Sequence, residues 1–396
     1  MSLTKIFLQH LKSPKIKSFV VGTAILTGLF LVSLSRDSYS FISLNSQQQS
    51  NTATITQRDR IVLADAHNLE QAVLTDFVDL VIIPTYDRLL GQAIVLKTAV
   101  DRFVAKPTPE HLKAARVAWL GTRTPWEQSE AFAFGPASSL GYDGDLDDWP
   151  VNETDVTAIL KSGDRLTPEY VTNLQTTAKG FHTIELLLFG TNNDKTASDF
   201  SRRELELLKL LAKAFETTSQ DLIESWVDGV SGNPPYRQVL IAAGERNNPA
   251  YLTKSAALEE IVQGMMGCLD EVANEKIGVP LTDKSTDDLE SRFSHSSLND
   301  FKNNLQSVEN AYWGGLPDTR SRGTSISDFV AQADVNLDRQ IKQEMQEAIA
   351  AIAAIPDPIE LKISDAEALE TLATAKEAIL KLFSTMEEKV LPLVQG

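Results

Sequence analysis

The stretch TPEYVTNLQTTAKGFHTIELLLFG, residues 167–190, combines the signals that begin and end a helix with an apolar pattern between them. Thr167 is typical of a helix N-cap, Pro168 of the first helical position, and Gly190 of the residue that follows the last turn. Apolar residues occupy both faces of the segment between these signals. The stretch therefore predicts one buried helix from Thr167 to Phe189.

Two polar residues interrupt this apolar run, because His182 and Glu185 lie three residues apart on one face of the predicted helix. Burying an unpaired carboxylate costs on the order of several kcal/mol, so the pair needs partners. Either the two groups are hydrogen-bonded to each other or to an arginine in the core, or they bind a metal ion. Gly180 favours the metal, since a mid-helix glycine costs ~1 kcal/mol and one reason to keep it is the close approach of another helix.

The composition predicts an acidic globular protein with a large core. The chain has 396 residues, of which 42% are hydrophobic, and a formal net charge of −17. This length is enough for two domains, and an acidic surface repels phosphate backbones, so nucleic acid is not expected as a partner. Cys268 is the one cysteine, which excludes an internal disulfide and a cysteine-based metal site.

The N-terminus differs from the rest of the chain. Four lysines within residues 5–17 precede an apolar stretch, residues 18–35, that is long for a signal peptide and barely long enough to span a bilayer. Residues 1–40 are therefore expected to be a signal peptide or a retained signal anchor, with the lysines in the cytoplasm. Residues 41–56 are polar and expected to be a linker, which places the remainder of the chain outside the cytoplasm.

Helical periodicity begins at about residue 57 and strand-like alternation is scarce, which predicts an all-α fold. Pro84 is expected to kink or break the first helix. The stretch VSGNPPYRQ, residues 230–238, predicts a division into two helical bundles, residues 57–235 and 236–396.

Two short similarities indicate that the bundles are related. VAWLG, residues 117–121, and NAYWG, residues 310–314, are each expected to end a helix in an aromatic residue and a glycine. Residues 135–153 are expected to form a long loop. Its YDGDLDD stretch lacks the glycine and the glutamate that an EF-hand requires at its sixth and twelfth positions, which argues against calcium.

A second group of candidates lies in RTPWEQSEAFAFGP, residues 123–136. Arg123, Glu127 and Glu130 are expected on one helical stripe, with Arg123 and Glu127 as a surface ion pair worth little. Glu130 is followed by alternating alanine and phenylalanine, so its carboxylate is expected in apolar surroundings. The stretch ESRFSHSS, residues 290–297, adds Arg292 and Ser294, whose alternative interpretation is a polar helix N-terminus.

These three stretches together resemble the imelysin-like family, also called the insulin-cleaving membrane protease family, and within it the iron-regulated protein A branch. The family hallmark G-x-H-x-x-E is matched by Gly180, His182 and Glu185, and the stretches beginning at Arg123 and Glu290 resemble further family blocks. The hexapeptide alone is weakly specific, whereas the three blocks in order are strongly so. The resemblance runs from about residue 57 to the C-terminus.

The resemblance implies an all-α protein of two related helical bundles, with its site near their interface. It implies export to the periplasm, either free or anchored to the periplasmic face of the inner membrane, and a role in iron acquisition. His182 and Glu185 are then the core of a metal site, with Glu130 as a third ligand and Arg123, Arg292 and Ser294 as further site candidates. Iron is the expected metal and zinc the alternative. The expected partners are a metal ion or iron chelate, and the membrane if the N-terminal segment is uncleaved.

Three functions remain open at this point. The first is an exported iron-handling protein, since iron accepts mixed imidazole and carboxylate ligands. The second is a metallopeptidase, which some family members are labelled; it is disfavoured because no second histidine follows His182 at the fourth position. The third is a helical scaffold without metal, in which His182 and Glu185 pair with Arg123 or Arg292.

The predicted topology can be tested with a reporter fused after residue 60. We expect the reporter to be active only outside the cytoplasm, because the basic residues hold the preceding segment in its orientation. A fusion that lacks residues 1–40 is the control and should stay in the cytoplasm. Cytoplasmic activity of the full fusion would contradict the topology.

Overall fold

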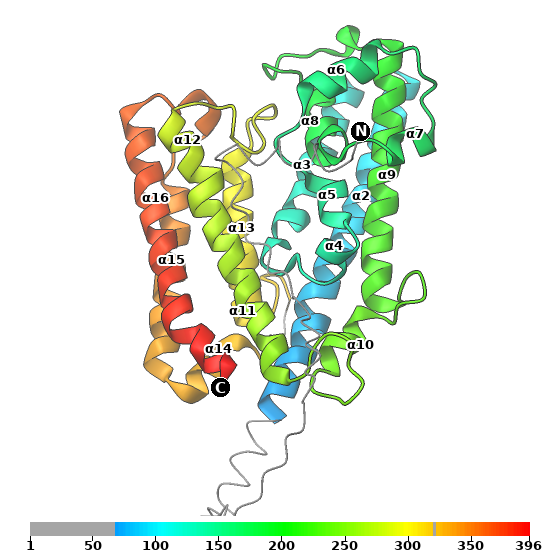
Figure 1. Ribbon diagram of the computed structural model, residues 1–396. Coiled ribbons are helices and arrows are strands. Elements are labelled where there is room, and N and C mark those ends of the chain that lie inside the picture. Colours follow the sequence, from blue (N-terminus) through cyan, green and yellow to red (C-terminus); the bar gives the residue numbers. More distant parts are fainter. Residues whose placement is uncertain (1–67, 320–321) are drawn as a thin grey trace, which may run out of the picture. The chain divides into compact units, whose positions relative to one another are not determined.

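Helices make up every regular element of the described chain, residues 68–319 and 322–396, in the computed structural model (Figure 1). The predicted all-α fold is thereby confirmed. The predicted N-terminal signal or anchor and the predicted linker lie outside the described residues.

The first half of the described chain begins with a helical segment at residues 68–77 and ends with a long helix before the break near residue 230. Its elements are η2 (Val78–Ile82), α2 (Ile83–Ala105), α3 (Pro109–Glu127), η3 (Glu130–Phe132), α4 (Pro136–Ser139), α5 (Tyr142–Asp147), α6 (Glu153–Lys161), α7 (Pro168–Thr172), η4 (Thr176–Ala178), α8 (Gly180–Phe189), η5 (Ala197–Asp199) and α9 (Arg202–Val227). The elements of the second half are α10 (Tyr236–Ile241), α11 (Lys254–Asp270), η6 (Glu271–Ile277), α12 (Gly278–Asp283), α13 (Ser297–Trp313), α14 (Ile326–Ala333), α15 (Val335–Ala353), η7 (Ile359–Leu361), α16 (Ala366–Thr385), η8 (Met386–Val390) and α17 (Leu391–Gln395).

The helices pack in two sets that meet along α3, α11 and α13. In the first set α2 packs against α3 and α9, and in the second α15 packs against α16 and α13 (Figure 1). Contacts of α3 with α13, and of α11 with η3, join the sets. All described residues belong to one compact unit, and the predicted division at residue 235 stays a prediction.

The first long helix continues through Pro84 rather than breaking there. A π-helical turn, Val78–Ile82, directly precedes the proline, which occupies the second position of α2. A proline inside a helix removes one backbone hydrogen bond, and the π-helical turn directly before Pro84 changes the bonding pattern at that point, so the chain stays helical. The apolar face of α2 then runs uninterrupted into the core, where Tyr86 is fully buried.

The stretch 167–190 does not form the single helix that its signals predict. Thr167 and Pro168 do begin a helix, but α7 ends at Thr172, and α8 begins only at Gly180. Gly180 has a φ of +74°, and a Cβ there would overlap the carbonyl oxygen of Leu146 and lie 2.8 Å from the carbonyl carbon of that residue. The glycine is therefore required by the close approach of α5, as expected, but as the first residue of a helix rather than as its middle.

Two other expectations were wrong. The segment 135–153 is not one loop, since it contains α4 and α5. VAWLG, residues 117–121, does not end a helix, because α3 continues through it to Glu127. NAYWG does end one, with Gly314 in the left-handed conformation after the last residue of α13.

Within the described part of the chain, no helix combines the length and the hydropathy that crossing a bilayer requires.

Substitution of Gly180 tests the close approach of α5 to α8. We expect Gly180→Ala to lower the free energy of unfolding by about 2–4 kcal/mol, because an alanine is strained at this φ and its Cβ displaces backbone. Gly91→Ala is the matched control: a Cβ at this position in α2 meets no atom within 4 Å, so the stability should rise by up to about 1 kcal/mol. Urea denaturation measures both; equal effects would contradict the packing described.

Candidate functional site

Arg123 lies at the centre of four buried carboxylates. Its side chain is 0% exposed and forms ion pairs with Glu127, Asp147, Glu290 and Asp300. Nη1 lies 2.5 Å from Asp147 Oδ1, Nη2 lies 3.0 Å from Glu290 Oε1, and Nε lies 3.4 Å from Asp300 Oδ1. The expectation of a surface pair with Glu127 was therefore wrong, because α5, α8 and α13 cover the end of α3.

Lys276 is a second buried cation beside the same carboxylates. It lies in the π-helical segment η6 and is 2% exposed. Its Nζ donates to Glu290 Oε1 at 2.9 Å, to Asn304 Oδ1 at 3.3 Å and to Glu127 Oε2 at 3.5 Å. Elements from both helix sets are thus joined by one network of charged groups.

His182 faces a carboxylate with each of its ring nitrogens. Nδ1 is hydrogen-bonded to Glu185 Oε2 at 3.2 Å, and Nε2 lies 3.0 Å from Asp147 Oδ1 without the geometry of a hydrogen bond. Burial would lower the pKa of His182, but the charge of Asp147 and the contacts with both carboxylates raise it to about 10.

Glu185 holds the imidazole in place from the other side. Its Oε1 accepts from the Phe293 N–H at 3.1 Å, from the Ser294 N–H at 2.8 Å and from the Ser294 hydroxyl at 2.7 Å. Its Oε2 contacts His182. Both oxygens are therefore engaged by protein donors, and the bond to Nδ1 turns Nε2 of His182 toward Asp147.

An acidic pocket of about 200 Å³ opens beside Asp147. The residues that line it are predominantly acidic: Glu130, Asp143, Gly144, Asp147, Asp148, Trp149, Glu271 and Glu290. The pKa of Asp143 is raised to about 7 by burial and by the charges of Asp147 and Glu271. Burial, and then the neighbouring acidic groups, raise the pKa of Glu130 as well, whereas the Arg123 charge overcomes burial and lowers the pKa of Asp147 to about 2.

Two groups of side chains, each including residues that line this pocket, could hold a metal ion. Ligand atoms of Asp147, His182 and Glu290 all lie within 4.8 Å of one another, and so do those of Glu127, Glu130 and Asp147. His182 Nε2 and Glu290 Oε2 are buried without a hydrogen-bond partner among the described residues. Unpartnered buried polar atoms are costly, and an imidazole nitrogen facing carboxylate oxygens suits a transition metal.

The imelysin sequence profile matches residues 82–386. The chain belongs to the imelysin family. It is 38% identical over 330 residues to iron-regulated protein A of Synechococcus elongatus, which covers 82% of this chain and 88% of that protein.

Two solved structures of the imelysin type share the fold. A protein described as an iron-regulated protein A precursor, from Parabacteroides distasonis, superposes with a TM-score of 0.73 at 30% identity, covering 83% of this chain and 94% of that one. An imelysin-like protein from Psychrobacter arcticum superposes with a TM-score of 0.64 at 16% identity, covering 83% of this chain and 97% of that one. The second likeness shows the fold alone.

The imelysin hallmark residues and two of the other candidates meet at one place. Ser294 contacts Glu185, and Glu130 reaches the acidic pocket, where it is half-buried. Arg292 is not part of this cluster, since it pairs with Glu153 at 2.5 Å. Glu130 does not continue the α3 stripe, because α3 ends three residues earlier and Glu130 begins η3.

Several residues of this imelysin site were not predicted. Asp147 lies in the acidic stretch GYDGDLDDWP, which resembles part of a family block and was weighed for calcium without Asp147 being chosen, and Glu290 is the first residue of the stretch ESRFSHSS. Lys276 lies in a helical segment outside the family blocks, and Asp300 lies in the block that begins at Glu290 but was not chosen as a site residue. Glu290 and Asp300 each stand close to apolar residues in the sequence, the same signal that singled out Glu130, and it could have found them.

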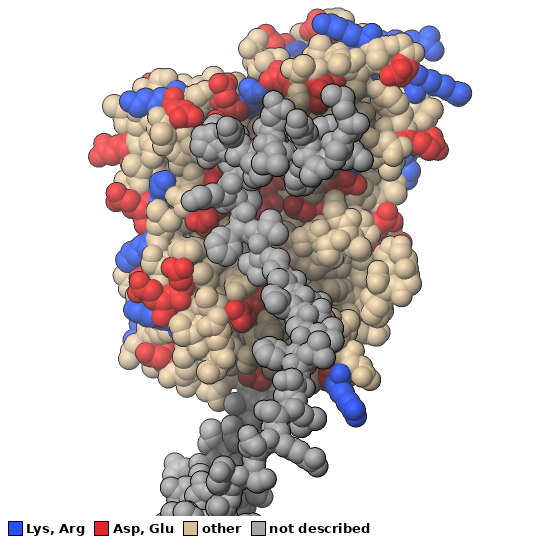
Figure 2. Space-filling model, viewed as in Figure 1, with Lys and Arg blue, Asp and Glu red and all other residues tan. Residues whose placement is uncertain are grey.

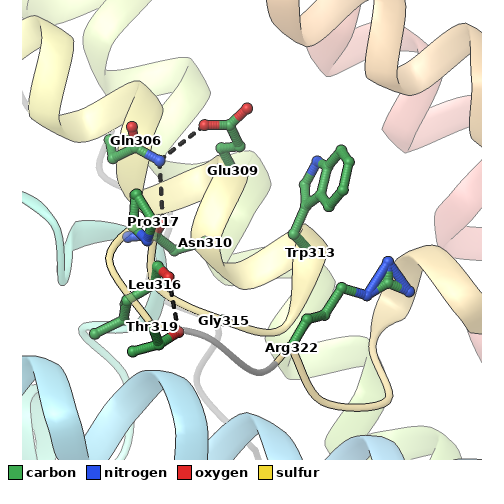
Figure 3. Close-up of a pocket in the computed structure, with 9 residues that line it drawn as sticks. All are labelled: Gln306, Glu309, Asn310, Trp313, Gly315, Leu316, Pro317, Thr319 and Arg322. Atoms are coloured by element: carbon green, nitrogen blue, oxygen red, sulfur yellow. Dashed lines mark hydrogen bonds between the residues drawn. The ribbon is translucent and has the colours of Figure 1, made fainter.

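A different pocket, of about 240 Å³, opens at the end of α13 (Figure 3). Gln306 donates to Glu309 at 2.8 Å and to Asn310 at 3.0 Å, and the Arg322 guanidinium lies over Trp313. None of the predicted site residues lines it.

The outer face of the imelysin fold also carries many acidic side chains, spread over both helix sets (Figure 2).

Removal of Arg123 tests how much the carboxylate cluster depends on this cation. We expect Arg123→Ala to lower the free energy of unfolding by about 3–5 kcal/mol, because it leaves buried carboxylates uncompensated. Arg88→Ala is the control: Arg88 forms a single ion pair with Asp318 and is 37% exposed, so the loss should stay within about 1 kcal/mol. A small loss at both positions in chemical denaturation would contradict the network.

Proposed function

We propose that the protein binds a transition-metal ion in the acidic pocket and that iron is its cargo. The observation that carries the proposal is the convergence of ligand atoms of Asp147, His182 and Glu290 within 4.8 Å of one another, with Glu290 Oε2 buried and without a hydrogen-bond partner among the described residues. A cation at this point would offset the desolvation of these groups.

The ligand chemistry favours iron, with zinc as the alternative. One imidazole and several carboxylates form a mixed nitrogen and oxygen ligand set, which iron accepts, whereas a structural zinc site would more often contain cysteine. The name of the Synechococcus relative, iron-regulated protein A, points the same way. The acidic groups at the pocket outnumber the buried cations Arg123 and Lys276, which favours an ion of high charge.

The remaining residues position the ligands. Glu185 orients His182 through Nδ1, and Ser294 hydrogen-bonds to Glu185. We therefore propose that Glu185 and Ser294 position the metal ligands and are not themselves ligands. Arg123 and Lys276 both bind Glu290 through Oε1, which leaves Oε2 for the ion. Glu130 stands at the edge of the pocket, where it would complete the ligand set from the side of solvent.

We further propose that this binding takes place outside the cytoplasm, in iron acquisition. The support is the basic and apolar pattern of residues 1–40 together with the iron-regulated relatives. The protein would then be periplasmic, or anchored to the periplasmic face of the inner membrane, and would receive a metal ion or an iron chelate.

Measuring the metal that the protein retains tests the proposal directly. Purified protein is equilibrated with ferrous iron under anaerobic conditions, with ferric citrate, and with zinc or manganese, and bound metal is determined by mass spectrometry after gel filtration. We expect the wild-type protein to retain iron. His182→Ala, Asp147→Asn and Glu290→Gln should each weaken iron binding by more than the ~10–100-fold typical of residues that only position a metal ligand. His111→Ala is the matched control, because that imidazole lies at the start of α3, where it is hydrogen-bonded to the carbonyl of Lys106 and not to the pocket residues.

Two further variants test in the same assay whether Glu185 and Glu130 are metal ligands. Glu185→Gln should weaken iron binding by about 10–100-fold if Glu185 orients His182, and by more if it is itself a ligand. Glu130→Gln should weaken binding only if Glu130 reaches the ion. Retention of no metal by the folded wild-type protein would refute the proposal. Chelator-sensitive cleavage of an unfolded substrate that His182→Ala abolishes would favour the metallopeptidase instead.

A further inference from the structure

Four oxidisable aromatic side chains follow one another through the first helix set and into the loop before α11. The ring centroids of Tyr86 and Trp226 lie 6.3 Å apart, those of Trp226 and Tyr236 lie 5.0 Å apart, and those of Tyr236 and Tyr251 lie 6.4 Å apart. Electron tunnelling slows exponentially with distance, so neighbouring rings at these separations exchange electrons readily. We call these four residues the aromatic chain.

One end of the aromatic chain touches the turn that carries Glu130. Tyr86 is fully buried on α2, and its hydroxyl donates to the Phe132 carbonyl at 3.4 Å. Phe132 and Glu130 belong to the same short helix, η3, and Glu130 lines the acidic pocket. The aromatic chain therefore begins beside η3, the short helix whose Glu130 lines the proposed iron site.

At the other end of the aromatic chain, a carboxylate is in place to accept a proton from a tyrosine hydroxyl. The Tyr236 and Tyr251 hydroxyls are hydrogen-bonded at 2.7 Å, and the Tyr251 hydroxyl donates to Glu260 Oε2. A phenol that loses an electron becomes strongly acidic and must release its proton, and Glu260 is in place to accept it. Burial raises the pKa of Glu260, which makes its carboxylate a better proton acceptor.

Tyrosine and tryptophan are not the only aromatic side chains that fill this core. Elsewhere the same core is filled by phenylalanine pairs, such as Phe103 with Phe200 and Phe181 with Phe215. Phenylalanine would fill the space of a tyrosine without a buried hydroxyl that requires a partner. Tyrosine and tryptophan differ from it in that they give up an electron far more easily.

We propose that the aromatic chain supplies an electron to the acidic pocket when a peroxide oxidises ferrous iron bound there. The inference rests on the proposed iron binding. Hydrogen peroxide takes up two electrons and two protons to give two molecules of water. Ferrous iron supplies one electron and becomes ferric, and the Tyr251 phenol supplies the other through Tyr236, Trp226 and Tyr86. The phenolic proton passes to Glu260, Tyr251 becomes a neutral phenoxyl radical, and the two protons that peroxide needs come from water.

This route would protect the ligands themselves. Ferrous iron alone gives one electron, and the second oxidising equivalent of the peroxide would otherwise attack His182 or a neighbouring side chain. The aromatic chain moves that equivalent to Tyr251, which is 5% exposed and lies away from the pocket. An added thiol could then return the radical to the phenol.

The experiment is freeze-quench electron paramagnetic resonance on the full chain. Protein loaded with ferrous iron without oxygen is mixed with an equimolar amount of hydrogen peroxide and frozen. We expect a tyrosyl phenoxyl signal whose hyperfine pattern narrows when ring-deuterated tyrosine is incorporated. Tyr251→Phe should lose this signal, and Trp226→Phe, which keeps an aromatic ring in the core, should lose it as well because the chain is interrupted.

Tyr312→Phe is the matched control. Tyr312 is equally buried and donates to a carboxylate, Asp338 Oδ1, at 3.1 Å. Among the ring contacts of the described residues it pairs with no member of the aromatic chain. It lies twelve residues along α13 from Asp300, which is about 18 Å by helical rise. This variant should keep the full signal.

Bound iron and circular dichroism are measured on the same samples, which separates the two proposals. Absence of bound iron in folded wild-type protein would overturn the proposed function, and the electron route with it. Bound iron without a phenoxyl radical would overturn the electron route alone. So would a radical that Tyr312→Phe diminishes as much as Tyr251→Phe does.

Discussion

The structure depends on one buried arginine that joins elements far apart in the sequence. Arg123 projects from α3 and binds carboxylates on α5, on the segment before α13 and on α13 itself. A guanidinium suits this position because it stays charged when buried and offers several donors in a fixed plane. Arg123 compensates carboxylates that line or adjoin the acidic pocket, so the same contacts hold the helices together and shape the pocket.

The sequence predicted the helices better than it predicted how they end. The helix cap at Thr167 was recognised because a cap is a local contact between a side chain and a nearby backbone N–H. The end of α7 and the start of α8 at Gly180 were not, because they are imposed by α5, which packs against Gly180 from a distant point in the chain. Local signals find where a helix can begin, while tertiary contacts decide where the backbone must turn.

The same distinction between local and tertiary signals explains which residues of the candidate site could be predicted from the sequence. His182, Glu185 and Glu130 stood out because a polar residue in an apolar run is visible in the sequence. Asp147 and Glu290 were overlooked as candidates, since their importance comes from the cations that face them in space. The likeness to the imelysin family supplied the hallmark residues, but not the carboxylate, Asp147, that faces the other side of the imidazole.

The charge balance at the pocket limits what it can do. If Arg123 and Lys276 neutralised every carboxylate around them, the pocket would attract no ion; with neither of them, the carboxylates could not be buried together. Their contacts with Glu290 use one oxygen and leave the other without a partner. Fixed internal cations therefore assemble the carboxylates while an excess of negative charge remains. If the proposed metal ion binds here, its release would not require unfolding, because the arginine and the lysine hold the carboxylates in place whether or not the ion is there.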